Sequence, residues 1–187
     1  MKRRLMLQGF AGALLAGAGT VAAQFFPSAL PKGQSVETLQ RDWKKLLAKD
    51  AKVAADATPL VKTDEEWRRT LDPAAYEVLR HEGTERPFTS KLNDEHRAGV
   101  FVCAGCALPL FTSAMKFESG TGWPSYFTTI PGAFAQKNDT KLILPRTEYH
   151  CAKCGGHHGH VFDDGPEPTG LRYCNNGVAL RFIPLKA

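Results

Sequence analysis

Residues 149–156 read Tyr149-His150-Cys151-Ala152-Lys153-Cys154-Gly155-Gly156, and residues 101–106 read Phe101-Val102-Cys103-Ala104-Gly105-Cys106. Each stretch places two cysteines at Cys-x-x-Cys spacing in strand-and-turn sequence, with a glycine inside or after the pair that permits a tight turn. Two such pairs supply the four thiolates of a tetrahedral metal site, for which zinc is the usual ion. The pattern therefore predicts one structural zinc ion, bound by Cys103, Cys106, Cys151 and Cys154.

The two pairs are also compatible with two disulfides or with redox-active dithiols. A redox dithiol normally occurs once, at the start of a helix, whereas both pairs here fall in strand-and-turn sequence. The 44 residues between Cys106 and Cys151 exceed the usual spacing of a zinc ribbon. We therefore expect a substantial structure to be inserted between the two turns.

The fifth cysteine, Cys174, lies outside the two pairs, in the stretch Arg172-Tyr173-Cys174-Asn175-Asn176. A lone cysteine is often an inert core residue, but the polar neighbours argue against that interpretation here. The run His157-His158-Gly159-His160 lies shortly before it in the sequence. One unpaired thiol with imidazoles nearby is typical of an enzyme that uses a cysteine nucleophile.

The first 23 residues predict a signal peptide rather than part of the fold. Met1-Lys2-Arg3-Arg4 is basic, residues 5–23 carry no charge, and Val21-Ala22-Ala23 offers a small-residue cleavage site. The adjacent arginines and the modest hydrophobicity favour a twin-arginine signal over a general secretory one, and therefore a periplasmic protein. An uncleaved membrane anchor is the alternative, which the four glycines of the apolar run weaken.

The charge of the chain argues against a nucleic-acid partner. The 187 residues carry a formal charge of +5, and removal of the three basic residues of the signal lowers it to +2. The basic character thus belongs largely to the signal, and we expect neither nucleic acid nor a stable membrane partner for the mature chain. The roughly 164 residues that are left suffice for one hydrophobic core but not for two.

Helices are predicted in the first part of the mature chain. Residues 36–49 follow a helical period between flexible stretches. Thr63-Asp64-Glu65-Glu66 is a capping box, which predicts a helix start. Asp72-Pro73 predicts the N-cap and first position of another helix, which ends near Gly83.

Short strands are predicted from residue 99 onward, because the segments become short, apolar and bounded by glycine or proline. In the last of them Val178, Leu180 and Phe182 alternate with other residues, as one buried face requires. Such spacing without intervening helices favours an antiparallel sheet or barrel. The predicted strands are 100–103, 108–111, 142–144, 147–150, 171–174 and 178–182.

Residues 63–184 contain several short motifs in a fixed order, which include both Cys-x-x-Cys pairs. The other motifs are Gly83-Thr84-Glu85-Arg86-Pro87-Phe88, Phe117-Glu118-Ser119-Gly120-Thr121-Gly122-Trp123-Pro124-Ser125, His157-His158-Gly159-His160-Val161-Phe162, Asp164-Gly165-Pro166 and Thr169-Gly170-Leu171-Arg172-Tyr173-Cys174. The set resembles the B-type methionine sulfoxide reductases (MsrB), enzymes that repair oxidised proteins and are specific for methionine-R-sulfoxide. The resemblance covers about two thirds of the chain.

This resemblance implies the fold class and the domain organisation. We expect a mainly β (α+β) fold, in which two antiparallel sheets form a barrel-like body with N-terminal helices and a four-cysteine zinc site away from the reactive thiol. The expected divisions are a signal peptide at 1–23, a leader and N-terminal helix at 24–62 outside the family match, and an MsrB catalytic domain at 63–185.

The resemblance also implies roles for five residues. Cys174 is the expected nucleophile, and His157, His160 and Asn176 are the expected active-site residues around it. Trp123 is expected to bind the S-methyl group of the substrate, although a tryptophan in this setting can also be a plain core aromatic. Imidazole groups near their pKa suit protonation of the sulfoxide oxygen while the thiolate attacks the sulfur.

The chain departs from the family pattern at four positions near the expected site. Asn175 stands where an aliphatic residue is usual, and Gly177 stands where serine is usual. His158, where leucine is usual, is expected to be an exposed substitution rather than a third catalytic histidine. Thr121 occupies the position at which many family members carry a resolving cysteine, just before Gly-Trp-Pro.

The absence of a resolving cysteine implies a one-cysteine cycle. Cys174 becomes a sulfenic acid, and an external thiol, most naturally a thioredoxin-like donor, reduces it. Two alternatives stay open at this point. One is a zinc-ribbon binding module in which Cys174 is inert, and the other is a thiol redox sensor that uses the two cysteine pairs.

Overall fold

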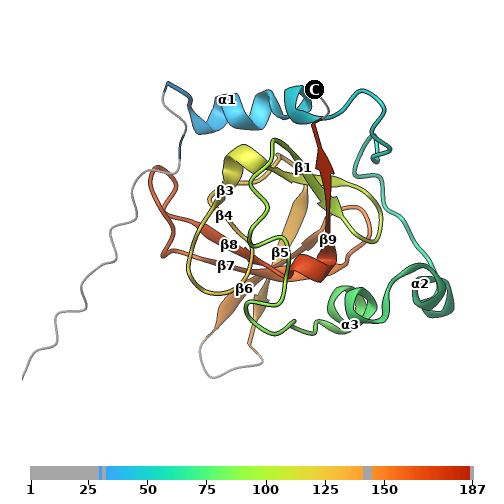
Figure 1. Cartoon of the computed structure of the whole chain (residues 1–187). Coiled ribbons are helices and arrows are strands. Elements are labelled where there is room, and N and C mark those ends of the chain that lie inside the picture. Colours follow the sequence, from blue (N-terminus) through green and yellow to red (C-terminus); the bar gives the residue numbers. More distant parts are fainter. Residues whose placement is uncertain (1–29, 31–32, 141–144, 186–187) are drawn as a thin grey trace, which may run out of the picture.

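Two antiparallel sheets wrap into a barrel-like body in the computed structural model, which describes residues 30, 33–140 and 145–185 (Figure 1). The smaller sheet has the strand order β2-β1-β9, and the larger sheet has the order β3-β4-β8-β7-β6-β5. The strands are β1 (Gly99–Cys103), β2 (Pro109–Thr112), β3 (Lys116–Phe117), β4 (Ser125–Tyr126), β5 (Phe134–Asp139), β6 (Arg146–Cys151), β7 (His157–Phe162), β8 (Arg172–Asn175) and β9 (Leu180–Pro184). The expected mainly β fold is confirmed.

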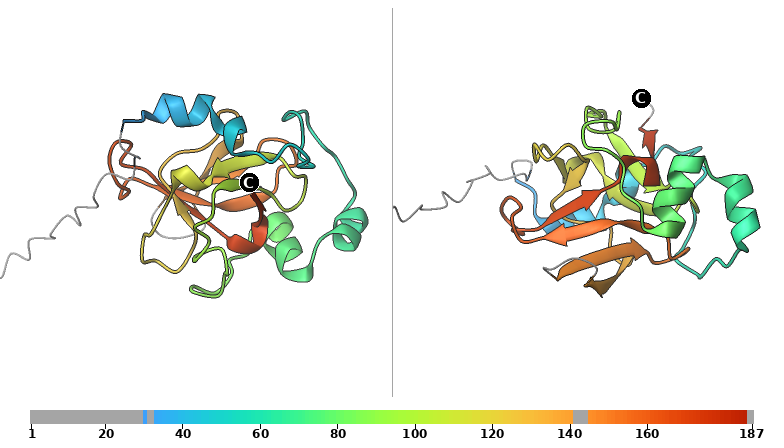
Figure 2. Two further views of the ribbon diagram at one scale, coloured as in Figure 1. Left: turned by 45° about the horizontal axis from the view of Figure 1, so that its top comes forward. Right: turned by 90° about the horizontal axis from the view of Figure 1, so that it is seen from below.

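Within the described residues, three short α-helices and three 3-10 helices accompany the sheets. Figures 1 and 2 show α1 on a different side of the barrel from the pair formed by α2 and α3. The α-helices are α1 (Val36–Arg41), α2 (Asp64–Thr70) and α3 (Pro73–His81), and the 3-10 helices are η1 (Trp43–Leu46), η2 (Ser113–Met115) and η3 (Gly177–Ala179). Among the described residues, none of the helices has the length and hydrophobicity needed to span a membrane.

The core lies between the two sheets and is rich in aromatic side chains. Phe111 of β2 stacks on Tyr126 of β4 with ring centroids 3.8 Å apart, and Phe101 of β1 meets the same tyrosine edge-on at 5.2 Å. All three side chains are fully buried. Burial of each such ring stabilises the fold by about 1.5–3 kcal/mol, so these contacts fasten the smaller sheet to the larger one.

The helix starts at Thr63 and Asp72 are confirmed. The hydroxyl of Thr63 accepts a hydrogen bond from the main-chain N–H of Glu66, whose carboxylate accepts one from Thr63 in return. Pro73 is the first residue of α3, which ends where Glu82 adopts a left-handed conformation. The buried face of α3 packs on the barrel and carries Ala75, Tyr76, Val78 and Leu79.

Two predicted elements differ from the structure. The helix expected at 36–49 is wrong in extent, since α1 stops at Arg41 and only the 3-10 helix η1 follows. The strand expected at 178–182 begins late, at Leu180. The carboxylate of Glu85 accepts hydrogen bonds from the N–H groups of Gly177 and Val178, which form part of a 3-10 turn instead of a strand ladder.

Other differences concern strands that the sequence pattern did not reveal. β3, β4, β5 and β7 were not predicted, because two are only two residues long and the other two are mostly polar. The predicted strand at 142–144 and the predicted signal peptide at 1–23 lie outside the described residues.

Candidate active site and metal centre

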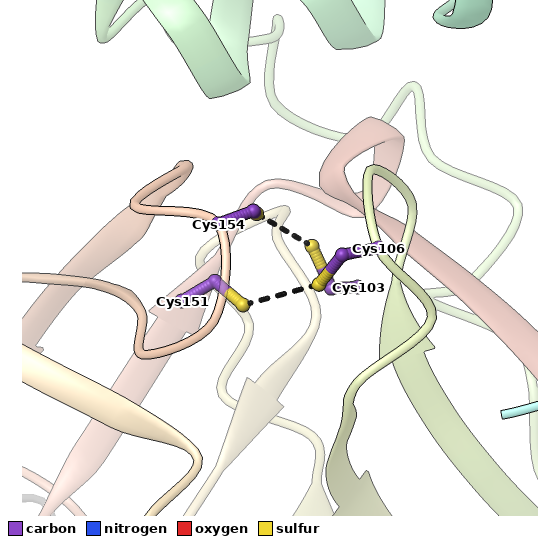
Figure 3. A group of neighbouring side chains, drawn as sticks. All are labelled: Cys103, Cys106, Cys151 and Cys154. Carbon is purple, nitrogen blue, oxygen red and sulfur yellow. Dashed lines mark hydrogen bonds between the residues drawn. The ribbon is translucent and has the colours of Figure 1, made fainter. Parts of the chain in front are cut away.

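The two Cys-x-x-Cys motifs lie next to each other, and their side chains point toward one another (Figure 3). Cys103 and Cys151 are the last residues of β1 and β6, and Cys106 and Cys154 lie in the turns that follow. The two turns have matching geometry. In each, the carbonyl of the first cysteine accepts a hydrogen bond of 2.9 Å from the N–H four residues later, at Ala107 and Gly155. Both of those residues adopt positive φ angles.

The four sulfur atoms fit a metal ion. They lie within 4.8 Å of one another, and the sulfur of Cys103 is 3.7 Å from that of Cys154, while the sulfur of Cys106 is 3.5 Å from that of Cys151. Four ligands at about 2.3 Å around a tetrahedral ion stand about 3.8 Å apart, whereas a disulfide needs about 2.05 Å. All five cysteines of the chain are free thiols, so the disulfide alternative finds no support.

Cys174 lines a separate pocket of about 130 Å³, to which none of the four clustered cysteines contributes. The pocket brings Cys174 together with His160, Asn176 and Trp123, four of the residues that the resemblance singled out. Its lining residues are Thr84, Trp123, Arg146, Gly159, His160, Phe162, Cys174, Asn175 and Asn176. His157 is not among them and lies behind His160, with ring centroids 5.5 Å apart.

The strand ladder of the larger sheet positions the thiol. Cys174 on β8 stands directly opposite His160 on β7 and directly opposite Ser125 on β4. Directly opposed residues of antiparallel strands project to the same face, with Cβ atoms about 4.5–5.5 Å apart. Gly159 allows this close pairing, since a Cβ atom there would lie 2.0 Å from the carbonyl oxygen of Cys174.

The thiol of Cys174 is partly exposed and sits in a mixed electrostatic environment. Burial raises the pKa of Cys174, while the guanidinium of Arg172 and a hydrogen bond from Thr121 lower it. Arg172 is itself held by two hydrogen bonds of 2.7 and 2.8 Å to the carboxylate of Asp164. Thr121 therefore lies near the thiol, while its place as the substitute for a resolving cysteine stays a prediction.

A carboxylate supports each of the two histidines. His160 Nε2 lies 2.7 Å from Asp139 Oδ2, which also accepts a hydrogen bond of 2.7 Å from Arg146. Burial lowers the pKa of His160, and the hydrogen bond to Asp139 opposes that effect. The carboxylate fixes Nε2 as the protonated nitrogen of the neutral ring and stabilises the imidazolium when it forms.

The second histidine is more deeply buried. His157 Nδ1 lies 2.8 Å from Glu148 Oε1, and both side chains are almost fully buried. Lys137 approaches the other oxygen of Glu148 at 3.1 Å, so that the charge of this carboxylate is compensated. The arrangement resembles that of His160 and gives the site two imidazoles of fixed orientation.

Glu85 connects the pocket walls to one another. Its main-chain carbonyl accepts a hydrogen bond of 3.1 Å from the indole of Trp123, and its N–H donates one of 3.0 Å to Asn176 Oδ1. The amide of Asn176 also donates to the carbonyl of His158. The side-chain oxygen and nitrogen of Asn176 are therefore both hydrogen-bonded to main-chain groups, and these bonds hold the end of β8 in place.

His158 is fully buried, so the expectation of an exposed substitution is wrong. It lies in the bulge of β7, where the ladder to β6 shifts register, and its ring packs against Phe134. Burial lowers its pKa to about 4, so the ring is neutral at physiological pH. Neither ring nitrogen makes a well-formed hydrogen bond within the described residues, although the nearby side chain of Asn175 partly opposes the lowering of the pKa.

Asn175, the neighbouring departure from the family pattern, is also fully buried. Its amide oxygen accepts a hydrogen bond of 3.0 Å from the hydroxyl of Tyr149, and its amide nitrogen donates to the carbonyl of Asn176. The other departure, Gly177, leaves no room for a side chain, since a Cβ atom there would lie 1.9 Å from the hydroxyl of Ser90.

The carboxylates behind the two histidines were not predicted from the sequence, and neither was a role for the pair formed by Arg172 and Asp164. Arg172 and Asp164 stand inside the quoted motifs, so the motifs carried the signal for them. Glu148 lies in a strand that was predicted, but only its pairing with the unpredicted strand β7 shows that it meets His157.

The comparisons with known proteins agree with this arrangement. A family model described as the SelR domain matches residues 71–184. The chain is 56% identical over 124 residues to a "Peptide methionine sulfoxide reductase MsrB" of Pseudomonas putida (strain W619), which covers 66% of this chain and 93% of that protein. A protein of the same name from Bradyrhizobium diazoefficiens is 49% identical over 136 residues, or 72% of this chain and 98% of that protein. By its domain match and its identity to these relatives, the chain belongs to the MsrB family of methionine sulfoxide reductases.

Proposed function

We propose that this chain reduces methionine-R-sulfoxide in proteins and peptides to methionine, with Cys174 as the nucleophile. The observation that carries the proposal is the pairing of Cys174 with His160 across two neighbouring strands, in a pocket that Trp123 also lines. The pocket thus combines a thiol, an imidazole and an aromatic wall within the family fold. The aromatic face suits the apolar S-methyl group of the substrate.

In the first step the thiolate of Cys174 attacks the sulfur of the sulfoxide. The sulfoxide oxygen gains negative charge and must be protonated, which His160 does directly or through water, with His157 next to it. The carboxylate of Asp139 stabilises the imidazolium form of His160, and Glu148 holds His157 in a fixed orientation. Methionine then leaves, and the oxygen stays on the enzyme as the sulfenic acid of Cys174.

In the second step an external thiol donor reduces the sulfenic acid. Two donor thiols become a disulfide, the oxygen leaves as water, and Cys174 returns to its reduced state. The donor is external because Thr121 occupies the resolving position and the other four cysteines lie together in the metal cluster. A thioredoxin-like protein fits this role.

We propose zinc as the ion bound by the four cysteines. The set of four thiolates and its near-tetrahedral spacing support zinc, because soft sulfur ligands in this geometry select it. Such a closed site leaves no open coordination position, so the ion would stabilise the fold and take no part in the reaction.

The deciding experiment offers the purified chain both epimers of a methionine sulfoxide peptide, with dithiothreitol as the reductant. We expect turnover of the R epimer and almost none of the S epimer. Equal turnover of both would contradict the assignment. A zinc-ribbon binding module or a redox sensor would reduce neither epimer, and alkylation of the metal-loaded chain would leave Cys174 unmodified in the module.

We further propose that residues 1–23 direct export by the twin-arginine route, so that the enzyme works in the periplasm. The basic start, the uncharged run and the small-residue site support this. The test fuses residues 1–23 to a reporter that is active only after export. Replacement of both Arg3 and Arg4 by lysine should abolish export in this system, whereas unchanged export would contradict the twin-arginine route.

A further inference from the structure

One segment of the chain runs between the 3-10 helix η1 and α2 and forms neither helix nor strand. It comprises residues 51–62, and we call it the strap. Figure 1 shows it along one side of the barrel. The strap lies outside residues 71–184, the part of the chain that the family model matches.

The strap is hydrogen-bonded to both cysteine motifs. The N–H of Ala54 donates to the carbonyl of Ala107 at 2.9 Å, and the N–H of Leu60 donates to the carbonyl of Lys153 at 2.7 Å. Ala107 directly follows Cys106, and Lys153 lies between the two cysteines of the second motif. One short segment therefore joins two turns that are 44 residues apart in sequence.

The side chain of Lys153 adds a second connection between the strap and the second motif. Its ammonium group donates to the carbonyl of Thr58 at 2.9 Å and lies 3.5 Å from the carboxylate of Asp56. The Lys153 side chain is largely buried, so these contacts are partly shielded from water.

The strap is also packed and not a loose linker. Val53, Ala54, Ala57 and Leu60 are partly buried against the hydrophobic core, whereas Val61 is 90% exposed. Apolar contacts of this kind hold an irregular segment in place where ladder hydrogen bonds are absent.

The helices after the strap also contact the cysteine turns, and Figure 3 shows a green helix ribbon above the four cysteines. Arg80 donates to the carbonyl of Cys154 at 3.0 Å. Trp67 and Leu79 stand within ordinary contact distance, 3.5 and 3.6 Å, of the position that a Cβ atom would take at Gly105. The cysteine turns are thus contacted by the strap and by the two helices that follow it in the sequence.

Loss of a metal ion from such a centre requires the two turns to separate, because each turn holds two of the four ligands. Separation is a local opening, and its free energy depends on the contacts that must break. The strap is hydrogen-bonded to the first turn through Ala54 and to the second turn through Leu60. Because these two residues belong to one short segment, separation of the two turns must break at least one of the two hydrogen bonds.

We propose that the strap is a metal-retention clamp, which holds the two Cys-x-x-Cys turns together and slows release of the bound ion. The proposal concerns the rate of metal loss and adds nothing to the chemistry at Cys174. It gives a role to the stretch before α2, which the reaction does not use.

The test measures zinc transfer from the zinc-loaded mature chain to an excess of the chromogenic chelator pyridylazoresorcinol. Ala54→Pro and Leu60→Pro each remove one bridging N–H. Each should accelerate transfer about fivefold to tenfold, the effect of one lost hydrogen bond. Lys52→Pro is the matched control, because the N–H of Lys52 makes no hydrogen bond within the described part of the chain. Its rate should equal that of the wild type.

A second measurement distinguishes local stabilisation of the two cysteine turns from general stabilisation of the barrel. Amide hydrogen exchange of residues 103–107 and 151–155 should speed up in the two strap variants, while exchange in β5 and β8 stays unchanged. Lys153→Met, which keeps the main chain intact and removes only the contacts of the ammonium group, should accelerate transfer about twofold to threefold.

Three outcomes would overturn the proposal: unchanged transfer rates in all strap variants, equal acceleration in Lys52→Pro, or faster exchange throughout the barrel. If both proline variants fail to fold, the Lys153→Met rate decides alone. Reduction of the R epimer is measured on the same wild-type preparation, so a failure of the proposed activity would be recognised separately.

Discussion

His160 and Cys174 are directly opposed residues of the neighbouring strands β7 and β8. The same row continues to Glu148 on β6 and Lys137 on β5 on one side, and to Ser125 on β4 on the other. A cation, a carboxylate, an imidazole, a thiol and a hydroxyl thus follow one another across the sheet. The strand register alone brings the imidazole to the thiol.

Replacement of His160 by glutamine should lower kcat/KM for an R-sulfoxide peptide by roughly 10²–10⁴-fold, the usual contribution of a general acid. Glutamine keeps polarity and approximate size but cannot supply the proton. Asp139→Asn should have a smaller effect in the same direction, because it weakens support for the imidazolium. Zinc content and circular dichroism serve as controls, and near-wild-type activity of His160→Gln would contradict the role.

The pH dependence of Cys174 alkylation should be displaced to the alkaline side of an ordinary cysteine, whose pKa is about 8.5. Thiolate forms as pH rises, and burial raises the pKa of this thiol, so less of it is ionised at neutral pH. Arg172→Met should move the profile further upward, since the guanidinium lowers the pKa. Iodoacetamide rates measured between neutral and alkaline pH check both statements, and a downward shift in the variant would refute the second.

Replacement of Cys103 or Cys151 by serine should remove the zinc ion and cause aggregation or melting at a lower temperature. Binding of zinc by thiolates supplies folding free energy, with apparent values of roughly 10–16 kcal/mol in zinc-finger peptides. Elemental analysis and thermal unfolding measure the two effects. Cys174→Ser is the matched control, because it removes activity but should retain the metal. An active wild-type chain without metal would refute the site.

The metal centre and the helix starts were predictable because their determinants are local. The Cys-x-x-Cys spacing identifies Cys103 and Cys106 as a pair of metal ligands, and the capping box depends only on Thr63 and Glu66. The carboxylates behind the histidines were not predictable in this way, because Asp139 and Glu148 act through strand pairing. The strand β5 that carries Asp139 is mostly exposed and polar and gives no hydrophobic signal.

A single turnover without reductant should leave Cys174 as a sulfenic acid that dimedone traps. The four clustered cysteines should form no disulfide with it, because they line no part of its pocket. Thr121→Cys should create an intramolecular disulfide with Cys174 if the two sulfur atoms can meet with disulfide geometry, since Thr121 lies near enough to the thiol to lower its pKa. Mass spectrometry distinguishes the products, and a wild-type disulfide between Cys174 and any clustered cysteine would overturn the one-cysteine cycle.

Replacement of His158 by leucine should stabilise the chain by about 1–3 kcal/mol, because it removes two buried nitrogens that make no well-formed hydrogen bond and fills the same space with an apolar side chain. The comparison variant Asn175→Leu should destabilise by a similar amount, since it leaves the hydroxyl of Tyr149 unpaired. Urea unfolding measures both. A destabilised His158→Leu would show that the imidazole makes a polar interaction in solution.

The bulge in β7 explains why the burial of His158 was not predicted. The expectation of exposure rested on the replacement of a usual leucine by a polar imidazole, and β7 itself was not predicted. In the structure the ladder between β6 and β7 shifts register between Tyr149 and His150, next to His158. A bulge of this kind changes which side chains turn inward, and it arises from the pairing of two strands. Sequence spacing within one strand cannot reveal it.

The β6–β7 hairpin carries Cys151 at the end of its first strand, Cys154 in its turn, and His157 and His160 on its return strand. A slip of one residue in this hairpin would turn His160 away from Cys174, because side chains alternate between the faces of a strand. An ion bound by Cys151 and Cys154 would fix the position at which the hairpin reverses. We therefore expect chains that fold without the ion to include inactive molecules in which β6 and β7 are paired one residue out of register.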